Sequence, residues 1–177
     1  MSKKRFKTVD IAVIGIMTAI LMVAKVALDF LPNIELVSFL MILYGICFGW
    51  RVFVVIPVFV VVQYALYPPG DWLILYTYVW WIPAICGVVF KKADNIWGWS
   101  IFSGLYGLFF GVFYALIYFV IGLRDGGMAL GFSSAFGKWI SGIPFDLLHC
   151  VGNFAVMLML YKPVRKTFTR IKKSLYN

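Results

Sequence analysis

Charged residues are scarce in this sequence. Of its 177 residues only 13% are charged, whereas 63% are hydrophobic and 19% are aromatic. A soluble domain is typically about one quarter charged and about half apolar. A water-soluble fold of this length could not bury so much apolar surface, so lipid must replace water around most of the chain. The composition therefore predicts an integral membrane protein.

Residues that typically carry out catalysis are also few. The chain has one histidine, and its three cysteines, Cys47, Cys86 and Cys150, each lie inside an apolar run. Three cysteines without regular spacing give neither a disulfide framework nor a zinc motif. The HExxH, GxSxG and P-loop patterns are missing as well. We therefore expect that the protein is not an enzyme and that it has no cofactor and no metal site.

The net charge of +9 could indicate nucleic-acid binding, but the basic residues are distributed differently. They gather at the two ends of the chain, next to apolar segments: Lys3, Lys4, Arg5 and Lys7 at one end, and Lys162, Arg165, Lys166, Arg170, Lys172 and Lys173 at the other. No basic face with interleaved exposed aromatics remains once the apolar segments are removed. The basic runs are typical of topology signals and of contacts with anionic lipid headgroups.

Six apolar runs separated by short polar segments predict six transmembrane helices. These helices lie at about residues 9–28, 34–48, 52–67, 72–90, 97–122 and 138–161. A spanning helix needs about 20 residues, so the second and third are short and we expect them to be tilted or partly buried in protein. The runs lack the two-residue alternation of a β-barrel, and open strand edges are unstable in lipid. The prediction is one all-α transmembrane domain over residues 1–177.

The orientation of this bundle follows from the positive charges. If the N-terminus faces the cytoplasm, thirteen of the sixteen basic residues fall on the cytoplasmic side. The opposite side then collects acidic residues, namely Asp29, Glu35, Asp71 and Asp125, together with Arg124 and Lys138. Because cytoplasmic loops carry an excess of Lys and Arg, both termini are predicted to be cytoplasmic.

Polar residues in the last apolar run form the strongest candidate site. Asp146, His149 and Asn153 are spaced i, i+3 and i+7, which places them on one helix face. This face could contact a ligand, or it could be a buried polar network that holds the bundle together. Lys25, near the end of the first run, either pairs with Asp29 at the membrane surface or points inward toward an anionic group. Polar groups inside membrane helices are costly, so each requires a partner.

Aromatic residues suggest a second wall for the same pocket. Trp72, Tyr76 and Trp80 are spaced four residues apart and follow the rigid segment Pro68-Pro69-Gly70-Asp71. Such a stripe offers flat surface with polar tips, although Tyr and Trp also collect in belts at membrane interfaces. We expect an outward-facing pocket between this stripe and the Asp146–Asn153 stripe, with Lys25 or Glu35 at its rim.

Small residues indicate close contacts between helices. Gly15 and Ala19 form a small-xxx-small pair in the first apolar run, and Gly104, Gly107 and Gly111 recur in the fifth. Such pairs let helix backbones approach closely, within one protein or between two.

Together these features resemble the S components of energy-coupling factor (ECF) transporters, the vitamin-binding membrane subunits of prokaryotic importers. The resemblance covers the whole chain and rests on six helices in under 200 residues, the basic N-terminus and the Gly15–Ala19 pair. The segment 32–37 and the run 142–149 with Asn153 strengthen it. Within these, segments 33–37 and 146–153 look most like the cobalamin-type subgroup.

The resemblance implies a function that the residues alone do not show. An S component binds a vitamin from outside with high affinity and docks through its first helix onto a transmembrane coupling subunit, which sits on two cytoplasmic ATPases. It would lie in the plasma membrane of a prokaryote, with Gly15 and Ala19 at the docking face where the family has two alanines. Cobalamin is the first expectation for the cargo, with pantothenate or folate as alternatives. A self-sufficient, homo-oligomeric small transporter, using Lys25, Asp146 and His149 as a proton relay, is the rival hypothesis.

Overall fold

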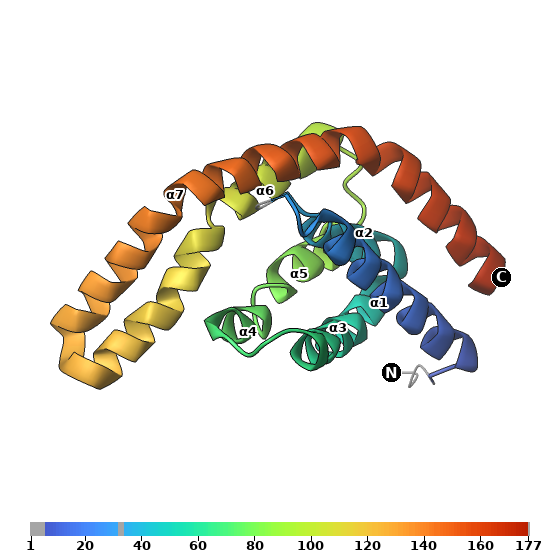
Figure 1. Cartoon of the computed structure of the whole chain (residues 1–177). Coiled ribbons are helices and arrows are strands. Elements are labelled where there is room, and N and C mark those ends of the chain that lie inside the picture. The colour runs from blue at the N-terminus through green and yellow to red at the C-terminus, as the bar shows by residue number, and fades with distance from the viewer. Residues whose placement is uncertain (1–5, 32–33, 177) are drawn as a thin grey trace.

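The computed structural model describes residues 6–31 and 34–176, which are almost entirely helical (Figure 1). The elements are α1 (Thr8–Leu28), α2 (Val37–Phe48), the 3₁₀ turn η1 (Gly49–Arg51), α3 (Val52–Leu66), α4 (Asp71–Tyr76), α5 (Trp81–Val89), α6 (Ile96–Leu108) and α7 (Phe110–Tyr176). No strand occurs in these two ranges, which confirms the all-α prediction. Lys3, Lys4, Arg5, Pro32 and Asn33, which entered the topology and family arguments, lie outside the described residues.

Helix α2 is the core of the molecule. All of its residues are buried, and they are apolar on every side except for Ser38. A helix that is hydrophobic all round is stable in a protein core or in lipid, and here other helices enclose it. Helix α5 packs closely on it, because Gly45 and Gly87 lie where a Cβ atom would meet the backbone of the opposite helix. Helix α1 is joined to α2 by a hydrogen bond from the Tyr44 hydroxyl to the Met17 carbonyl, 3.1 Å long.

Helix α7 is a hairpin rather than a rod. Gly126 and Gly127 depart from helical geometry, and Gly127 has φ +79°, in the left-handed region that favours glycine. Figure 1 shows the first arm running away from α6 to this bend and the second arm returning, crossing α6 and continuing to the C-terminus. The arms approach closely because Gly122 and Gly131 present no side chain to each other's backbone.

Several predicted helices have different boundaries in the structure. The predicted helix 72–90 is divided into α4 and α5 by a turn at 77–80. Pro83 follows in the first turn of α5, where a helix tolerates proline. The predicted helix 97–122 is interrupted at Phe109. The predicted helix 138–161 begins instead directly after Gly127 and continues to Tyr176, because two glycines are enough to reverse the chain.

The outer surface is strongly apolar. Val23, Phe132 and Val151 are each more than 60% exposed, and they belong to a much larger set of exposed apolar side chains. Four helical stretches have the length and composition to cross a membrane: Thr8–Leu28, Val37–Leu66, Asp71–Val89 and Ile96–Tyr176. A soluble monomer rarely exposes so much contiguous apolar area, so the surface is compatible with a membrane protein.

A polar cluster joins the two ends of the chain. The buried Asp10 carboxylate accepts hydrogen bonds from Arg51 Nε at 2.6 Å and from the Tyr176 hydroxyl at 2.8 Å. The Arg51 guanidinium also lies 4.1 Å from the centre of the Tyr176 ring. This end clasp, Asp10–Arg51–Tyr176, ties the start of α1 and the α2–α3 connection to the last turn of α7.

The α2–α5 contact makes a first prediction. Substituting Gly87→Ala places a methyl group against the Ile42 carbonyl, so the helices must separate. We expect a destabilisation of about 1–3 kcal/mol, the usual cost of overpacking, seen as a lower unfolding temperature in detergent. Gly137→Ala is the matched control, because its Cβ would meet open space. Equal unfolding temperatures for the two variants would contradict the close packing.

Candidate binding site

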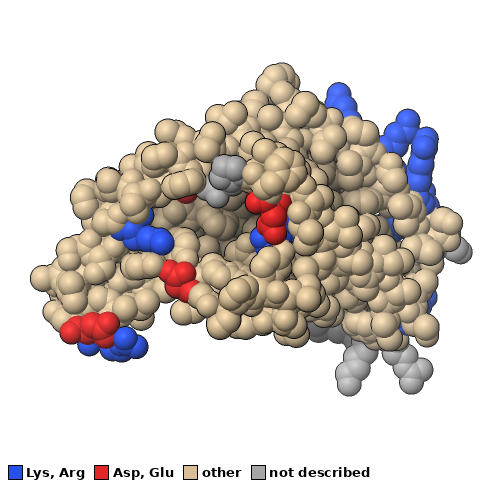
Figure 2. Space-filling model, in the orientation of Figure 1, with Lys and Arg blue, Asp and Glu red and all other residues tan. Residues whose placement is uncertain are grey.

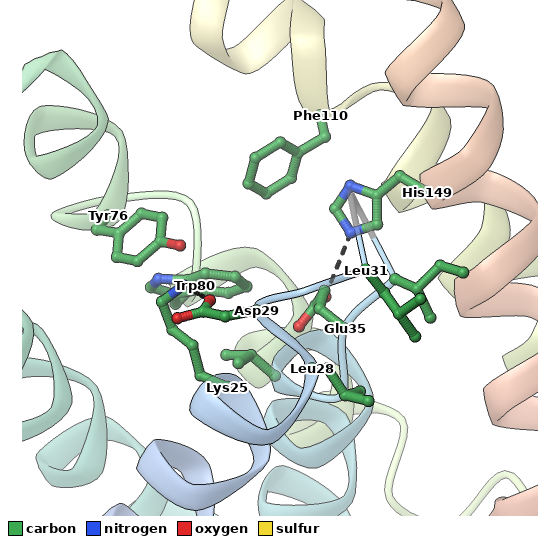
Figure 3. Close-up of a pocket in the computed structure, with 11 residues that line it drawn as sticks. Lys25, Leu28, Asp29, Leu31, Glu35, Tyr76, Trp80, Phe110 and His149 are labelled. Carbon is green, nitrogen blue, oxygen red and sulfur yellow. Dashed lines mark hydrogen bonds and ion pairs between the residues drawn. The ribbon is translucent and has the colours of Figure 1, made fainter.

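A cavity of about 280 Å³ lies where the end of α1, the start of α2 and the start of α7 meet (Figure 3). It is lined by Lys25, Leu28, Asp29, Leu31, Ile34, Glu35, Val37, Tyr76, Trp80, Phe110 and His149. Figure 2 shows a hollow in this face of the molecule, with acidic and basic side chains beside it. Charged groups in an apolar protein are costly, so their convergence here marks a candidate site.

At the rim, Lys25 is paired rather than free. Its Nζ lies 3.1 Å from Asp29 Oδ1, four residues further along the chain. The Tyr67 hydroxyl donates to the other Asp29 oxygen at 2.9 Å, and the ammonium lies 5.3 Å from the centre of the Tyr67 ring. Lys25 therefore makes the local pair with Asp29 and also lines the cavity. An ammonium has three donors, which leaves capacity for a ligand acceptor.

At the base, a buried contact joins α7 to the connection between α1 and α2. His149 Nε2 lies 3.3 Å from Glu35 Oε1, and the backbone N–H of Ser38 donates to both Glu35 oxygens at 3.0 and 3.1 Å. The Ser38 hydroxyl also donates to Oε1. Burial favours the neutral acid, but the hydrogen bonds from His149 and Ser38 outweigh it and hold the pKa of Glu35 below its ordinary value. Glu35 is therefore ionised at neutral pH, and His149 donates to it through Nε2.

The aromatic stripe predicted from the sequence is continuous despite the break between α4 and α5. Ring centres are 5.1 Å apart for both Trp72–Tyr76 and Tyr76–Trp80, and each contact is edge-to-face. The stripe extends to Phe110, 6.1 Å from Trp80, and from Phe110 to His149 at 4.7 Å. Tyr76 and Trp80 line the cavity, whereas Trp72 packs behind them against Tyr67. Such contacts give a stiff aromatic wall.

Two buried polar atoms of this wall have no hydrogen-bond partner in the described part of the chain. They are the indole Nε1 of Trp80 and Nδ1 of His149. Trp80 and His149 are only 2% and 3% exposed, so water cannot easily replace a missing partner. Leaving a buried polar group unpaired costs about 1–3 kcal/mol. Trp80 and His149 both line the cavity, although these two atoms are themselves enclosed by protein.

The other members of the predicted helical stripe lie elsewhere. Asp146, His149 and Asn153 are all buried, at 4%, 3% and 0% exposure, but only His149 lines this cavity. Asp146 lines a separate hollow further along α7, and the Asn153 amide is buried with neither polar atom paired among the described residues. The predicted stripe therefore divides between two places.

Sequence reasoning did not select Asp29, Phe110 or Lys138 as ligand contacts. Asp29 was expected only as a partner for Lys25, and Lys138 only as a charge on the outer side. Phe110 is one of 17 phenylalanines, and no spacing distinguishes it from the others. Its position next to the α6–α7 break, with Gly111 beside it, is the only local signal that could have indicated its role.

The predicted docking pair, Gly15 and Ala19, lies on the side of α1 that faces away from the rest of the protein. Gly15 and Ala19 are exposed, and a Cβ on Gly15 would have no neighbour within 4 Å. The buried face of the same helix carries Val13, Met17 and Leu21. The small pair is therefore not used for packing inside the described part of this protein.

The described residues contain no cluster of three or more histidine, cysteine, aspartate or glutamate side chains that could hold a metal ion. Comparisons with protein-family models, with curated protein sequences and with solved structures found no match to this chain.

The Glu35–His149 contact makes a second prediction. Glu35→Gln keeps the shape of the side chain but removes the charge that accepts from Ser38 and His149. Hydrogen bonds to charged groups contribute about 1.5–3 kcal/mol, so we expect a clearly lower unfolding temperature. Asp125→Asn is the matched control, because its partner Arg124 is on the open surface. A loss of stability as large in Asp125→Asn would show that the Glu35 contact has no special role.

Proposed function

We propose that this protein is a membrane-embedded binding subunit for a vitamin or a similar small micronutrient. The observation that carries the proposal is a cavity bounded by an aromatic wall, with the charged groups of Lys25, Asp29 and Glu35 at its edge. Ligand sites combine apolar walls with a few convergent polar groups, as this cavity does. Recognition without catalysis fits the scarcity of residues that could act as nucleophile or base.

The proposed topology has six spans and two cytoplasmic termini. In it, α1, α2 and α3 each cross the membrane, and α4 and α5 together form the fourth span. Helix α6 with the first arm of α7 forms the fifth span, and the returning arm of α7 forms the sixth. The contacts support this arrangement because residues assigned to the same side meet. The end clasp joins Asp10, Arg51 and Tyr176, and Arg165 pairs with Asp94 on that same side.

The proposed assembly is an ATP-driven ECF transporter in the plasma membrane of a prokaryote. The partners would be a transmembrane coupling subunit and two cytoplasmic ATPases, because this chain has no nucleotide-binding motif. Its outward-facing Gly15–Ala19 surface supports a docking role for α1, since small residues allow the backbone of another helix to approach.

The cargo is proposed from two independent considerations. The sequence resemblance favours cobalamin, whereas the cavity of about 280 Å³, just below the usual size of small-molecule pockets, favours a smaller vitamin such as pantothenate or folate. Mass spectrometry of small molecules that co-purify with the protein identifies the cargo directly. Binding in detergent, without transport by the protein alone in liposomes, is the expected result. Uptake by the isolated protein, driven only by an ion gradient, would favour the self-sufficient transporter.

The unpartnered indole makes a third prediction. Trp80→Phe removes the N–H but keeps most of the aromatic wall. We expect the empty protein to be as stable as the wild type, while the co-purified ligand binds about 10-fold more weakly because the wall that packs against it loses part of its surface. Trp97→Phe, at an exposed position on α6, controls for the change of residue type. Unaltered affinity in Trp80→Phe would remove this residue from the site.

The docking surface makes a fourth prediction. Gly15→Leu and Ala19→Leu add bulk to an exposed face of α1, so we expect uptake in cells to be abolished while ligand affinity stays near normal. Ala27→Leu, exposed two turns further along the same helix, is the control and should retain uptake. Normal uptake by both docking variants would exclude this face as the contact with the coupling subunit.

A further inference from the structure

The last turns of α7, beyond the predicted final span, carry a row of basic side chains. Lys162, Lys166, Arg170 and Lys173 are spaced four, four and three residues apart, which places them on one side of the helix. All four are exposed, and they line a hollow of about 450 Å³. Figure 2 shows basic side chains projecting from this end of the molecule, where Figure 1 places the C-terminus. We call these four residues the basic face.

One acidic side chain lines the same hollow, and its charge is already compensated. Asp94, in the turn between α5 and α6, pairs with Arg165, which also donates to the Tyr161 hydroxyl at 2.7 Å. The chain has seven acidic residues, and each of the other six carboxylates has its partner elsewhere in the fold. No carboxylate in the described part of the chain is therefore paired with the basic face, and its four positive charges are uncompensated.

The helix that carries the basic face is fixed by contacts on its other side and at its ends. Phe168 lies opposite the basic face and is buried against α2, with its ring centre 5.5 Å from that of Tyr44 and 5.8 Å from that of Phe48. The pair between Arg165 and Asp94 holds the start of this segment, and the end clasp holds its last turn. The four charges thus belong to an anchored helix rather than to a free tail, which lowers the entropy lost when an anion binds.

The surroundings of the basic face are those of a membrane boundary. Met159, one turn before Lys162 on the same side of α7, is 66% exposed, so an apolar surface begins where the basic face ends. Trp97, three residues after Asp94, is 58% exposed, and exposed tryptophan is typical of the boundary between hydrocarbon and lipid headgroups. In the proposed topology this is the cytoplasmic boundary, where ammonium and guanidinium groups meet lipid phosphates.

We propose that the basic face is a binding site for an anionic phospholipid, whose phosphate lies in this hollow and whose acyl chains follow the apolar side of α7 from Met159. A zwitterionic lipid fits less well, because its own cation would be repelled by four uncompensated charges. A soluble phosphate would use the charges but not the apolar surface beside them. The inference uses the topology proposed above, but neither the cargo nor the partner subunits take part in it.

The test compares two phospholipids that have the same acyl chains, phosphatidylglycerol and phosphatidylcholine. Purified full-length protein in non-ionic detergent is mixed with each lipid, and binding is measured by native mass spectrometry and by the unfolding temperature. We expect the wild type to retain phosphatidylglycerol and to unfold at a higher temperature in its presence, because a ligand that binds the folded state stabilises it. Phosphatidylcholine should have little effect.

Two double variants locate the site. Lys166→Gln/Arg170→Gln removes two exposed charges of the basic face, and neither has an ion-pair partner among the described residues. Lys91→Gln/Lys92→Gln is the matched control, because it removes two exposed charges on the same side of the membrane but outside the hollow. We expect the affinity for phosphatidylglycerol to fall about 10-fold or more in the first and to stay within about 2-fold in the second. If the first variant is not folded without lipid, Lys162→Gln/Lys173→Gln makes the same test.

Four results would overturn the proposal. A wild type that retains no phosphatidylglycerol has no such site. Equal weakening in the two double variants would mean that the lipid responds to the overall charge rather than to the basic face. An equal rise in unfolding temperature with inorganic phosphate would identify a site for a soluble anion. Unchanged lipid binding in Lys166→Gln/Arg170→Gln, together with loss of a co-purifying protein, would show that the basic face contacts an acidic protein instead.

Discussion

The burial of α2 is the constraint on which the rest of the structure depends. A helix without a polar face has no stable position at a surface that borders water, and in this structure α1, α3, α5 and α7 surround it. Its first turn is where polarity enters, through Ser38 and the preceding Glu35. Because the core fixes that end of α2, the position of Glu35 is fixed as well. Glu35 therefore contacts His149, which lies 114 residues further along the sequence. The position of the candidate site is thus a consequence of where α2 begins.

Helical class and the burial of several candidate residues followed from the sequence because both depend on local patterns. Apolar runs separated by polar segments indicate helices, and residues at spacings of three and four share a face wherever the helix lies. This is why Trp72, Tyr76 and Trp80 form one stripe and why Asp146, His149 and Asn153 are all buried. Lys25 lies at the rim of the cavity, whereas Glu35, which was expected there too, lies at its base, where Ser38 and His149 hold its carboxylate.

What the sequence did not predict depends on contacts between distant segments. Between the predicted helices 97–122 and 138–161, a loop was expected. Instead, the chain turns at Gly126 and Gly127, and residues 128–137 are apolar enough to form helix directly after the turn. That extra helix carries Lys138 to the rings of Tyr114 and Tyr118. No spacing in one segment could show that Asp146 would face the Gly111 backbone rather than the cavity of His149. Separating those two residues required the three-dimensional path of the chain.

The end clasp bears on the order in which the molecule is made. Helix α1 leaves the ribosome first, and its buried Asp10 can meet Arg51 early, but its second partner, Tyr176, is synthesised 166 residues later. Until then the carboxylate is only partly satisfied in an apolar setting. The final turn of α7 therefore secures the base of a helix that is synthesised well before it. An affinity tag fused directly after Tyr176 would therefore disturb the start of α1, close to the exposed face that carries Gly15 and Ala19.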